Sequence, residues 1–340
     1  MPSVISTEHL FSYRPGESLA NFLTYFEFAK PPSDHRITVN NSGYGMLKSQ
    51  CFLKSKGQLT CTTCHDPHQP ASSAKAIVAC RSCHSSEHAS TETDCVGCHM
   101  PKRRTEDAVH VVMTDHSIRR QPLLGDPTAP LRERHDRWAG PIEDLYPRSV
   151  QDTPENRLYR AVAQIGVSAD LATDIASLQH AIQAARPAAI EPYLAWADAL
   201  KKAGRHSEAL EAYRMAMEKA SADARPYVAA AELLAGSGQL TQAVNLLKLA
   251  IRKLPEDTTI LNALAVLYVS QERYGEALRV SSKAVAINGD DPVSWVNFGV
   301  CSEAMKNKKG AEAAYRQAVL LQPDLQRAND LLRRVSEDKF

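Results

Sequence analysis

The sequence predicts a mostly α-helical protein in two parts, a loop-rich cofactor-binding domain followed by an all-α solenoid of helix pairs. Seven of its eight cysteines lie between residues 51 and 98, and ten of its twelve histidines precede residue 150. Clustering of this kind indicates a cofactor or metal region rather than a disulfide-bonded fold. Residues 155–335, by contrast, are rich in Ala, Leu, Glu, Lys and Arg and have helical periodicity.

Composition and charge exclude several classes of protein. The 340 residues suffice for two or three domains, and 44% hydrophobic with 23% charged residues is typical of a globular protein. A formal net charge of +1 gives no basic excess for binding nucleic acid. No apolar run reaches the roughly 18 residues of a membrane-spanning segment. The first residues lack the basic start and apolar core of a secretory signal, and we expect a truncated N-terminus.

A change in composition near residue 150 sets the expected domain boundaries. Residues 1–140 form the cofactor domain, residues 141–154 a linker with three prolines, and residues 155–335 the solenoid. Thr153 is the expected N-cap of the first solenoid helix. Pro154 suits the first helical position, where a missing N–H leaves no hydrogen bond unmade.

Alanine recurs at a fixed step in the second half of the chain. The two series are Ala209, Ala243, Ala277, Ala311 and Ala216, Ala250, Ala284, Ala318. The step equals the period of the tetratricopeptide repeat (TPR), about 34 residues with one helix–turn–helix per unit. Small residues are expected where two helices cross closely. We expect a degenerate unit at residues 155–189, repeats at 190–223, 224–257, 258–291 and 292–325, and a polar capping helix at 325–336.

Other positions follow the same period. Gly204 and Gly238 supply turn signals between the helices of their repeats. A slot for large side chains holds Tyr193, Tyr227, Leu261 and Trp295. The alanines of the two series and these large side chains are expected to be core residues. Cys301, in the first helix of its repeat, is expected to be a small buried apolar residue.

Three pentapeptides carry the predicted chemistry. Each has the C-x-x-C-H spacing of a haem attachment site. Two cysteines three apart lie on one side of a helical turn and can both form thioether bonds to one haem, while the next residue offers an imidazole to the iron. The spacing predicts three covalently bound haem c groups with proximal histidines His65, His84 and His99, at Cys61/Cys64, Cys80/Cys83 and Cys95/Cys98.

Zinc is the alternative cofactor, because C-x-x-C pairs also form structural zinc sites. Zinc sites do not require a histidine directly after the second cysteine, whereas all three pairs have one. A thioredoxin-like redox pair needs a βαβ setting that the sequence does not indicate. The predicted fold class is therefore a loop-rich multihaem cytochrome c domain followed by an all-α TPR solenoid.

Each six-coordinate iron also needs a ligand on its other face. Spare histidines near the cysteine motifs make bis-histidine ligation the expected arrangement, with fairly low reduction potentials. The first candidates for distal ligands are His68, His110 and His116, followed by His35 and His88.

Basic residues flank the third motif and the two candidate ligands His110 and His116. Arginine pairs well with carboxylates, and three haems would carry six propionates. The candidates for propionate pairing are Arg103, Arg104, Arg119 and Arg120. An ordinary solvated basic face is an equal alternative. Cys51, outside the motifs, is expected to be a buried thiol.

Three segments resemble a known family: LTCTTCHDPH (59–68), CVGCHMPKRR (95–104) and HVVMTDHSIRR (110–120). They are similar to multihaem cytochromes c with C-terminal TPR repeats and, distantly, to the haem-packing modules of pentahaem nitrite reductases and octahaem hydroxylamine oxidoreductases. The resemblance implies that His68 and His116 are distal ligands, with His110 a weaker candidate. The sequence departs from the family pattern in that no C-x-x-C-H precedes Cys61. No C-x-x-C-K is present, so a nitrite-reductase type of active haem is not indicated.

The expected function is electron transfer by a periplasmic or otherwise extracytoplasmic multihaem c-type cytochrome. The TPR part would bind a redox partner protein, or a multihaem complex, on its concave face. One alternative is a multihaem reductase acting on a nitrogen or sulfur oxyanion. The second alternative is a non-redox TPR scaffold whose cysteine region binds zinc.

Overall fold

The chain forms two compact units. A computed structural model describes residues 3–5, 23–28, 37, 41–56, 58–84, 94–106, 108–121, 123, 125–132, 141–144, 152–168 and 170–337. The helical unit comprises Met1–Glu27 and Ala139–Phe340, and the cysteine-rich unit comprises Phe28–Trp138. This division differs from the expected one, because Met1–Glu27 belongs with the helices and not with the cysteines.

A small sheet accounts for the difference. Strands β1 (Ser3–Ile5), β2 (Leu23–Phe28) and β5 (Ile142–Asp144) are ordered β1-β2-β5, with β1 antiparallel to β2. Both β1 and β5 contact helix α6 (Pro154–Val167), and the Ile142 amide donates to Gln164 Oε1 at 2.8 Å. Part of the expected linker is thus a strand that packs on the first long helix.

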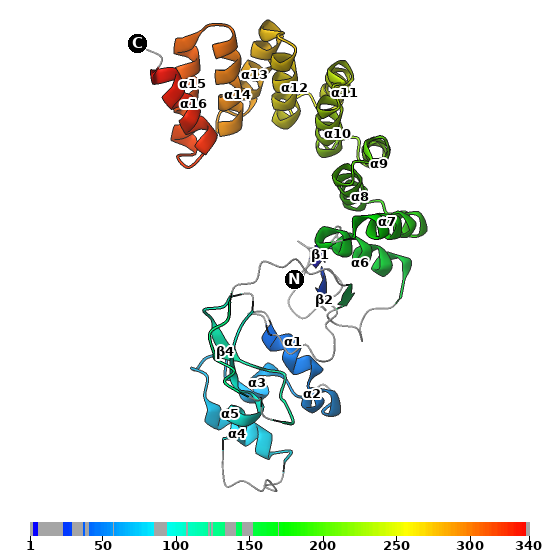
Figure 1. The fold of residues 1–340 in the computed structure, drawn as a ribbon, viewed down its shortest axis with the longest axis vertical. Coiled ribbons are helices and arrows are strands. Elements are labelled where there is room, and N and C mark those ends of the chain that lie inside the picture. Colours follow the sequence, from blue (N-terminus) through cyan, green and yellow to red (C-terminus); the bar gives the residue numbers. More distant parts are fainter. Residues whose placement is uncertain are drawn as a thin grey trace. The chain divides into compact units, whose positions relative to one another are not determined.

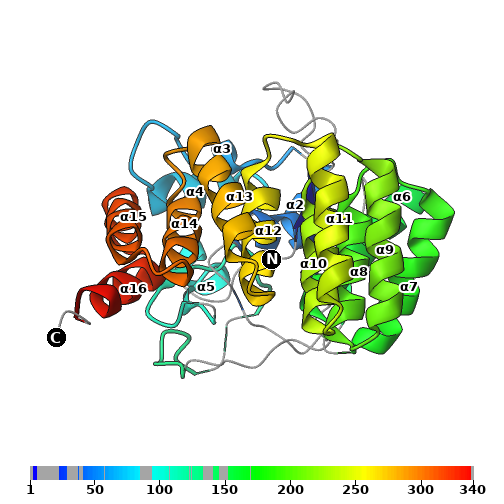
Figure 2. The same cartoon turned by 90° about the horizontal axis from the view of Figure 1, so that it is seen from above.

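Helix pairs follow one another along the helical unit (Figures 1 and 2). After α6 the helices are α7 (Leu171–Ala185), α8 (Glu191–Lys202), α9 (His206–Lys219), α10 (Arg225–Gly236), α11 (Leu240–Lys253), α12 (Thr258–Ser270), α13 (Tyr274–Ile287), α14 (Pro292–Ala304), α15 (Lys308–Leu321) and α16 (Gln326–Glu337). The first begins as expected, because Thr153 Oγ1 accepts the Asn156 amide and Pro154 occupies the first turn. In the described part of the chain, no helix combines the length and hydropathy needed to cross a bilayer.

The pairs stack so that first helices line one face. Helix α6 contacts α8, α10 contacts α12, and α12 contacts α14, while each second helix contacts the helices next to it in the chain. We call the side formed by α8, α10, α12 and α14 the first-helix face.

The two alanine series form the core of this stack, as expected. All eight alanines have no exposed surface: Ala209, Ala243, Ala277, Ala311, Ala216, Ala250, Ala284 and Ala318. Their small side chains allow the helices of a pair to approach closely, and larger side chains fill the space beside them. Tyr193, Tyr227 and Leu261 are buried, whereas Trp295 is half-buried and its Nε1 donates to the Gly289 carbonyl at 2.7 Å. Cys301 is buried among apolar side chains, also as expected.

The turn inside each pair repeats with the same period. Gly204, Gly238, Glu272 and Lys306 all have positive φ, at 75°, 77°, 58° and 62°. After each, the next amide reaches back across the turn: Arg205 to Leu200 O, Gln239 to Leu234 O, Arg273 to Tyr268 O and Asn307 to Ser302 O. This closure of a helix end requires a residue in the left-handed conformation, which glycine adopts without steric cost. Glycine marks the turn in only two repeats, so the sequence pattern did not show the other two.

The cysteine-rich unit contains short helices and one hairpin. The helices are α1 (Asn41–Lys48), α2 (Gln50–Lys54), α3 (Cys61–Cys64), α4 (Ser73–Arg81) and α5 (Cys95–His99). Strands β3 (Lys102–Arg104) and β4 (Val112–Thr114) pair antiparallel, with Arg103 opposite Met113. The hydrophobic side chains buried in the described part of this unit are Ile37 and Val109.

Arg104 ties the hairpin to the turn that follows it. Its Nε donates to the carbonyls of Thr128 (2.9 Å) and Ala129 (3.1 Å), and its Nη1 donates to that of Val109 (2.8 Å). A planar guanidinium can reach several carbonyls at once because its donors form a fixed fork.

The turn geometry predicts opposite effects of glycine at matched positions. Glu272→Gly and Lys306→Gly should each raise the free energy of unfolding by about 0.5–1 kcal/mol, because relief of the left-handed conformation outweighs the added chain entropy. Gly204→Ala and Gly238→Ala should each lower it by about 1 kcal/mol. Urea denaturation followed by circular dichroism measures both. Glu272→Ala is the control, since it removes the carboxylate but keeps the strain, and stabilisation by this variant would refute the explanation.

The contacts of Arg104 predict that lysine cannot replace it. Arg104→Lys should destabilise the turn at residues 125–132 by about 1–3 kcal/mol, because a single ammonium leaves partly buried carbonyls unpaired. Hydrogen exchange measured by mass spectrometry on the full-length chain should show faster exchange in that turn. Arg120→Lys, at an exposed arginine, serves as the control. Equal protection in both variants would contradict the structural role of Arg104.

Candidate functional site

Each C-x-x-C-H pentapeptide folds into a helical turn. Cys61–Cys64 is helix α3, and the His65 amide donates to the Cys61 carbonyl at 2.8 Å. Cys80 lies at the end of α4, where the His84 amide donates to its carbonyl at 3.0 Å. Cys95–His99 is helix α5. Residues three apart are neighbours on a helical surface, so the paired cysteines lie on one side of each turn.

Local sequence explains why such short turns form. Thr60 and Thr63 make a reciprocal capping box around α3, in which the Thr60 amide donates to Thr63 Oγ1 at 3.0 Å. Asp94 caps α5, because its Oδ1 accepts the Gly97 amide at 2.8 Å. Caps satisfy the free N–H groups of a helix start, which matters most when the helix is a single turn.

The six cysteines of the pentapeptides are thiols that face or border the surface. Cys61 and Cys83 are exposed, and the other four are half-buried: Cys64, Cys80, Cys95 and Cys98. Burial, assisted by the nearby Cys61, raises the pKa of the Cys64 thiol. Burial also raises the pKa of Cys80, with Cys95 as the next cause.

The β3–β4 hairpin returns the chain to α5. Directly after β4, the Asp115 amide donates to the Pro101 carbonyl at 3.0 Å, and the Arg119 amide donates to the His99 carbonyl at 2.8 Å. We call residues 115–119 the return segment. It therefore lies beside the third pentapeptide, although residues 100–114 stand between the two in the sequence.

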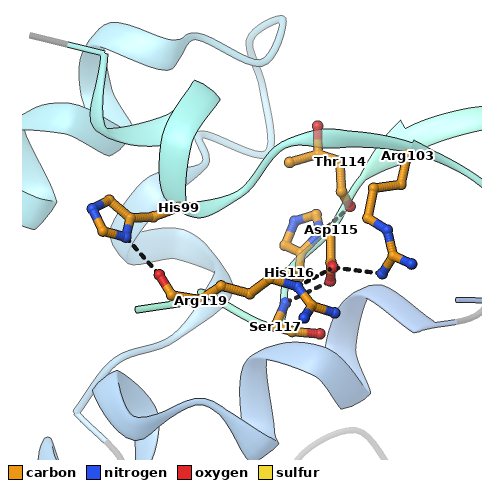
Figure 3. A network of polar contacts seen from close by, with 7 residues as sticks. All are labelled: His99, Arg103, Thr114, Asp115, His116, Ser117 and Arg119. Carbon is orange, nitrogen blue, oxygen red and sulfur yellow. Dashed lines mark hydrogen bonds and ion pairs between the residues drawn. The ribbon is translucent and has the colours of Figure 1, made fainter. Parts of the chain in front are cut away.

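Asp115 is the centre of a buried polar network in the return segment (Figure 3). Its side chain is fully buried, and Oδ2 accepts from Arg103 Nη1 at 2.9 Å and Arg119 Nε at 3.1 Å. Oδ1 accepts the Ser117 amide at 3.0 Å. Burial alone would raise the pKa of Asp115, but the hydrogen bonds from Ser117 and the two arginines outweigh it and lower the pKa below the usual range. The carboxylate therefore stays charged inside the fold.

The return segment places one imidazole opposite another. The ring centroids of His116 and His65 are 6.1 Å apart, with an interplanar angle of 35°. His116 Nδ1 lies 2.9 Å from the Thr114 carbonyl, which can only accept. Nδ1 must then carry the proton, so a neutral His116 ring keeps Nε2 as the nitrogen that can bind a metal.

The same segment holds the histidine of the third pentapeptide. His99 Nδ1 lies 2.5 Å from the Arg119 carbonyl (Figure 3). By the same reasoning Nδ1 donates, and Nε2 is the nitrogen of the neutral ring that could bind a metal. Orientation of this kind by a backbone carbonyl is usual for histidines that bind metals.

Helix α1 packs on the backbone of the return segment through Gly45. A Cβ at this position would lie 3.0 Å from the Ser117 amide nitrogen and 3.1 Å from the His116 carbonyl carbon. Both neighbours are backbone atoms, so a side chain at residue 45 would have to displace the return segment. Gly43, in the same helix, has nothing within 4 Å of its ideal Cβ.

Of the predicted distal ligands, His116 is the one that the structure places against a pentapeptide histidine. His68 and His110 are exposed. His35 and His88 lie outside the described residues. Cys51 is half-buried rather than buried as expected.

The arginines predicted to pair with propionates differ in their surroundings. Arg103 and Arg119 bind Asp115. Arg104 binds three backbone carbonyls, and Arg120 is exposed. Pairing with propionates stays a prediction for all four.

Asp115 and Gly45 were not predicted from the sequence. For Asp115 a local signal exists, because an Asp side chain commonly accepts the backbone amide of the residue two positions later. The zinc alternative gains no support, since no three His, Cys, Asp or Glu side chains converge as a metal site among the described residues.

Comparison with known proteins concerns the repeats. Residues 292–325 match the family model of the tetratricopeptide repeat. No curated protein matches the chain. Similar solved structures include a tetratricopeptide repeat protein from Parabacteroides merdae ATCC 43184, with 17% identity and a TM-score of 0.46 over 54% of this chain and 72% of that one. YrrB, a TPR protein with an unusual peptide-binding site, is 17% identical, with a TM-score of 0.40 over 52% and 91%.

A third similar structure is MamA from Desulfovibrio magneticus RS-1, 14% identical with a TM-score of 0.41 over 51% of this chain and 94% of that one. The matched residues 292–325 contain Ala311 and Ala318 of the two alanine series, and Lys306 of the left-handed turn. The chain thus contains a tetratricopeptide repeat at residues 292–325, and the three units before it have the same buried positions and the same turn.

Proposed function

We propose that the cysteine-rich unit binds three haem c groups covalently and transfers electrons. The cysteines of each pentapeptide would form the thioether bonds, and His65, His84 and His99 would be the proximal ligands. Bound haem would supply one-electron redox chemistry. The observation that carries the proposal is the close approach of two imidazoles, those of His65 and His116.

The distance between these rings fits two axial ligands of one iron. Imidazole nitrogens bind first-row metals at about 2 Å, so a metal shared by two rings separates their centroids by roughly 6 Å. The observed separation is 6.1 Å. His65 comes directly after the Cys61/Cys64 pair, which would attach the same haem. We therefore propose His116 as the distal ligand of the first haem.

The exposed surface of the motifs also supports a large cofactor. Helices α2 to α5 contain no buried residue, and Val78, within α4, is 69% exposed. A folded unit that buries few of its own apolar side chains needs another source of stability, such as a bound cofactor. Covalently held porphyrin would cover such apolar side chains and would act as the core.

The haems would lie close together, which suits a relay. The connections between the pentapeptides are short, since residues 66–79 alone separate the first from the second and residues 85–94 the second from the third. The protein's own residues would fix the axial ligands and their surroundings, which set the potentials. Because haem c forms after export, we also propose an extracytoplasmic location.

The TPR part would bind a redox partner or a subunit of a multihaem complex. Helical repeats offer extended surfaces for protein partners. Two exposed valines lie on the first-helix face, Val266 in α12 at 46% and Val293 in α14 at 47%. Burial of these apolar side chains by a partner would favour binding through the hydrophobic effect.

Covalent haem predicts a defined mass. The full-length chain, exported in a host that matures c-type cytochromes, should carry three haems by intact mass and should stain for haem on a denaturing gel. Cys61→Ala with Cys64→Ala should remove one haem. Cys51→Ala and Cys301→Ala are controls that should retain all three, since neither belongs to a pentapeptide. A colourless protein with the mass of the bare polypeptide would end the proposal.

Distal ligation by His116 predicts an effect of one histidine and not of another. His116→Ala should leave one iron without its second imidazole, so the reduced protein should bind one more carbon monoxide per chain than the wild type. His110→Ala, at an exposed histidine, should change nothing. Carbon monoxide titration followed by absorption spectroscopy measures the stoichiometry. Identical titrations of the wild type and His116→Ala would reject His116.

Docking on the first-helix face predicts selective crosslinking in the native host. A photoreactive amino acid at Val266 should crosslink to a protein that itself stains for haem. The same amino acid at Leu320, 72% exposed on the second helix α15, should not. An equal yield of crosslinks to haem proteins from Val266 and Leu320 would contradict docking on this face.

A further inference from the structure

We infer that Asp115 is a positioning residue for two haem irons at once, those of the first and third pentapeptides. The inference rests on the proposed function and goes beyond it. Its basis is that one short segment, residues 115–119, holds an imidazole of each site.

The Asp115 carboxylate fixes the shape of the return segment. Within the segment it accepts the Ser117 amide at 3.0 Å and Arg119 Nε at 3.1 Å. From outside the segment it accepts Arg103 Nη1, in strand β3, at 2.9 Å. The side chain is fully buried, so these bonds are not exchanged for bonds to water.

Two histidine contacts depend on that shape. His116, inside the segment, faces His65 of the first pentapeptide at 6.1 Å. The Arg119 carbonyl, at the end of the segment, accepts from His99 of the third pentapeptide at 2.5 Å. A displacement of the segment would therefore reorient an axial imidazole in two sites. Groups that orient a metal ligand through its second nitrogen tune the metal.

Helix α1 holds the segment from a second side. Because Gly45 has no side chain, the backbone of His116 and Ser117 can pack directly against it. A Cβ at this position would lie only 3.0 Å from the Ser117 nitrogen. Ile118 in the segment has a φ of 43°, a conformation that L-residues adopt only when the surroundings impose it. Hydrogen bonds to Asp115 and contact with Gly45 are thus two independent restraints on the same backbone.

The second pentapeptide serves as an internal reference. His84 is exposed, and among the described residues its ring makes no hydrogen bond to the return segment. Its haem should therefore report on the overall state of the protein but not on the position of the segment.

Electron paramagnetic resonance of the oxidised full-length protein tests the inference. Low-spin haems give signals that depend on the orientation of their axial ligands. Asp115→Asn should shift or broaden two of the three signals and leave one unchanged. Asp115→Glu retains the charge but lengthens the side chain, and it should also shift two signals, which a purely electrostatic role would not produce.

Gly45→Ala provides a second route, with Gly43→Ala as its matched control in the same helix. Gly45→Ala should shift the same two signals while every charge is retained, and Gly43→Ala should shift none. This pair decides the matter if the Asp115 variants fail to fold.

Three results would overturn the inference: no shift, a shift in all three signals, or a shift in Asp115→Asn that is absent from both Asp115→Glu and Gly45→Ala. The haem content is measured separately by intact mass. A wild-type protein without three haems would refute the proposed function, whereas three haems with unaltered signals would refute only the role of Asp115.

Discussion

A buried carboxylate must have partners, and in the cysteine-rich unit this requirement organises the polypeptide around Asp115. The charge stays inside the fold because two guanidinium groups and a backbone amide bind it. One of these partners lies in strand β3 and the others follow strand β4, so the carboxylate joins the hairpin to the return segment. Removing any one partner would leave a charged group unsatisfied, which is why the geometry around it is narrowly defined.

The two units reach stability in different ways. In the helical unit, eight alanines without exposed surface let the helices approach, and apolar side chains fill the remaining space. In the cysteine-rich unit, Ile37 and Val109 are the hydrophobic side chains buried among the described residues. Its order comes from directed contacts: caps on single-turn helices, Arg104 on three carbonyls, and the Asp115 network. Directed contacts hold side chains at fixed angles, which apolar packing does less strictly.

The sequence predicted the periodic part of the fold and missed what depends on contacts far apart in the chain. The alanine series was visible because helix crossing demands a small residue in every repeat. The left-handed turns at Glu272 and Lys306 were not, because those repeats accept the strain without glycine. The sheet of β1, β2 and β5 was missed because its strands are short and far apart in sequence. Asp115 and Gly45 were missed because their roles arise only when the hairpin returns the chain to α5 and α1.

His116 illustrates how far sequence reasoning reaches at the candidate site. Proximity and resemblance placed it among the first candidates with His68 and His110, since no pattern along the chain measures distance in space. In the structure His116 has its ring 6.1 Å from that of His65, which is the contact that favours it among the three candidates. The ring of His116 is oriented by a local contact with the Thr114 carbonyl, and its backbone is positioned by the tertiary contact with Gly45, which no pattern along the chain predicts.

The same contacts favour electron transfer over catalysis as the proposed role. A reductase needs an iron with an open position for its substrate, whereas a relay needs ligands that do not move when the charge changes. In the first site the facing imidazoles would occupy both axial positions. The Thr114 carbonyl fixes the ring of His116, and the Arg119 carbonyl fixes the ring of His99. The buried salt bridge between Asp115 and Arg119 fixes the backbone that contains both His116 and the Arg119 carbonyl. An iron held by two fixed imidazoles would have no position open to a substrate, and this is why the contacts at the first pentapeptide favour the proposed electron transfer.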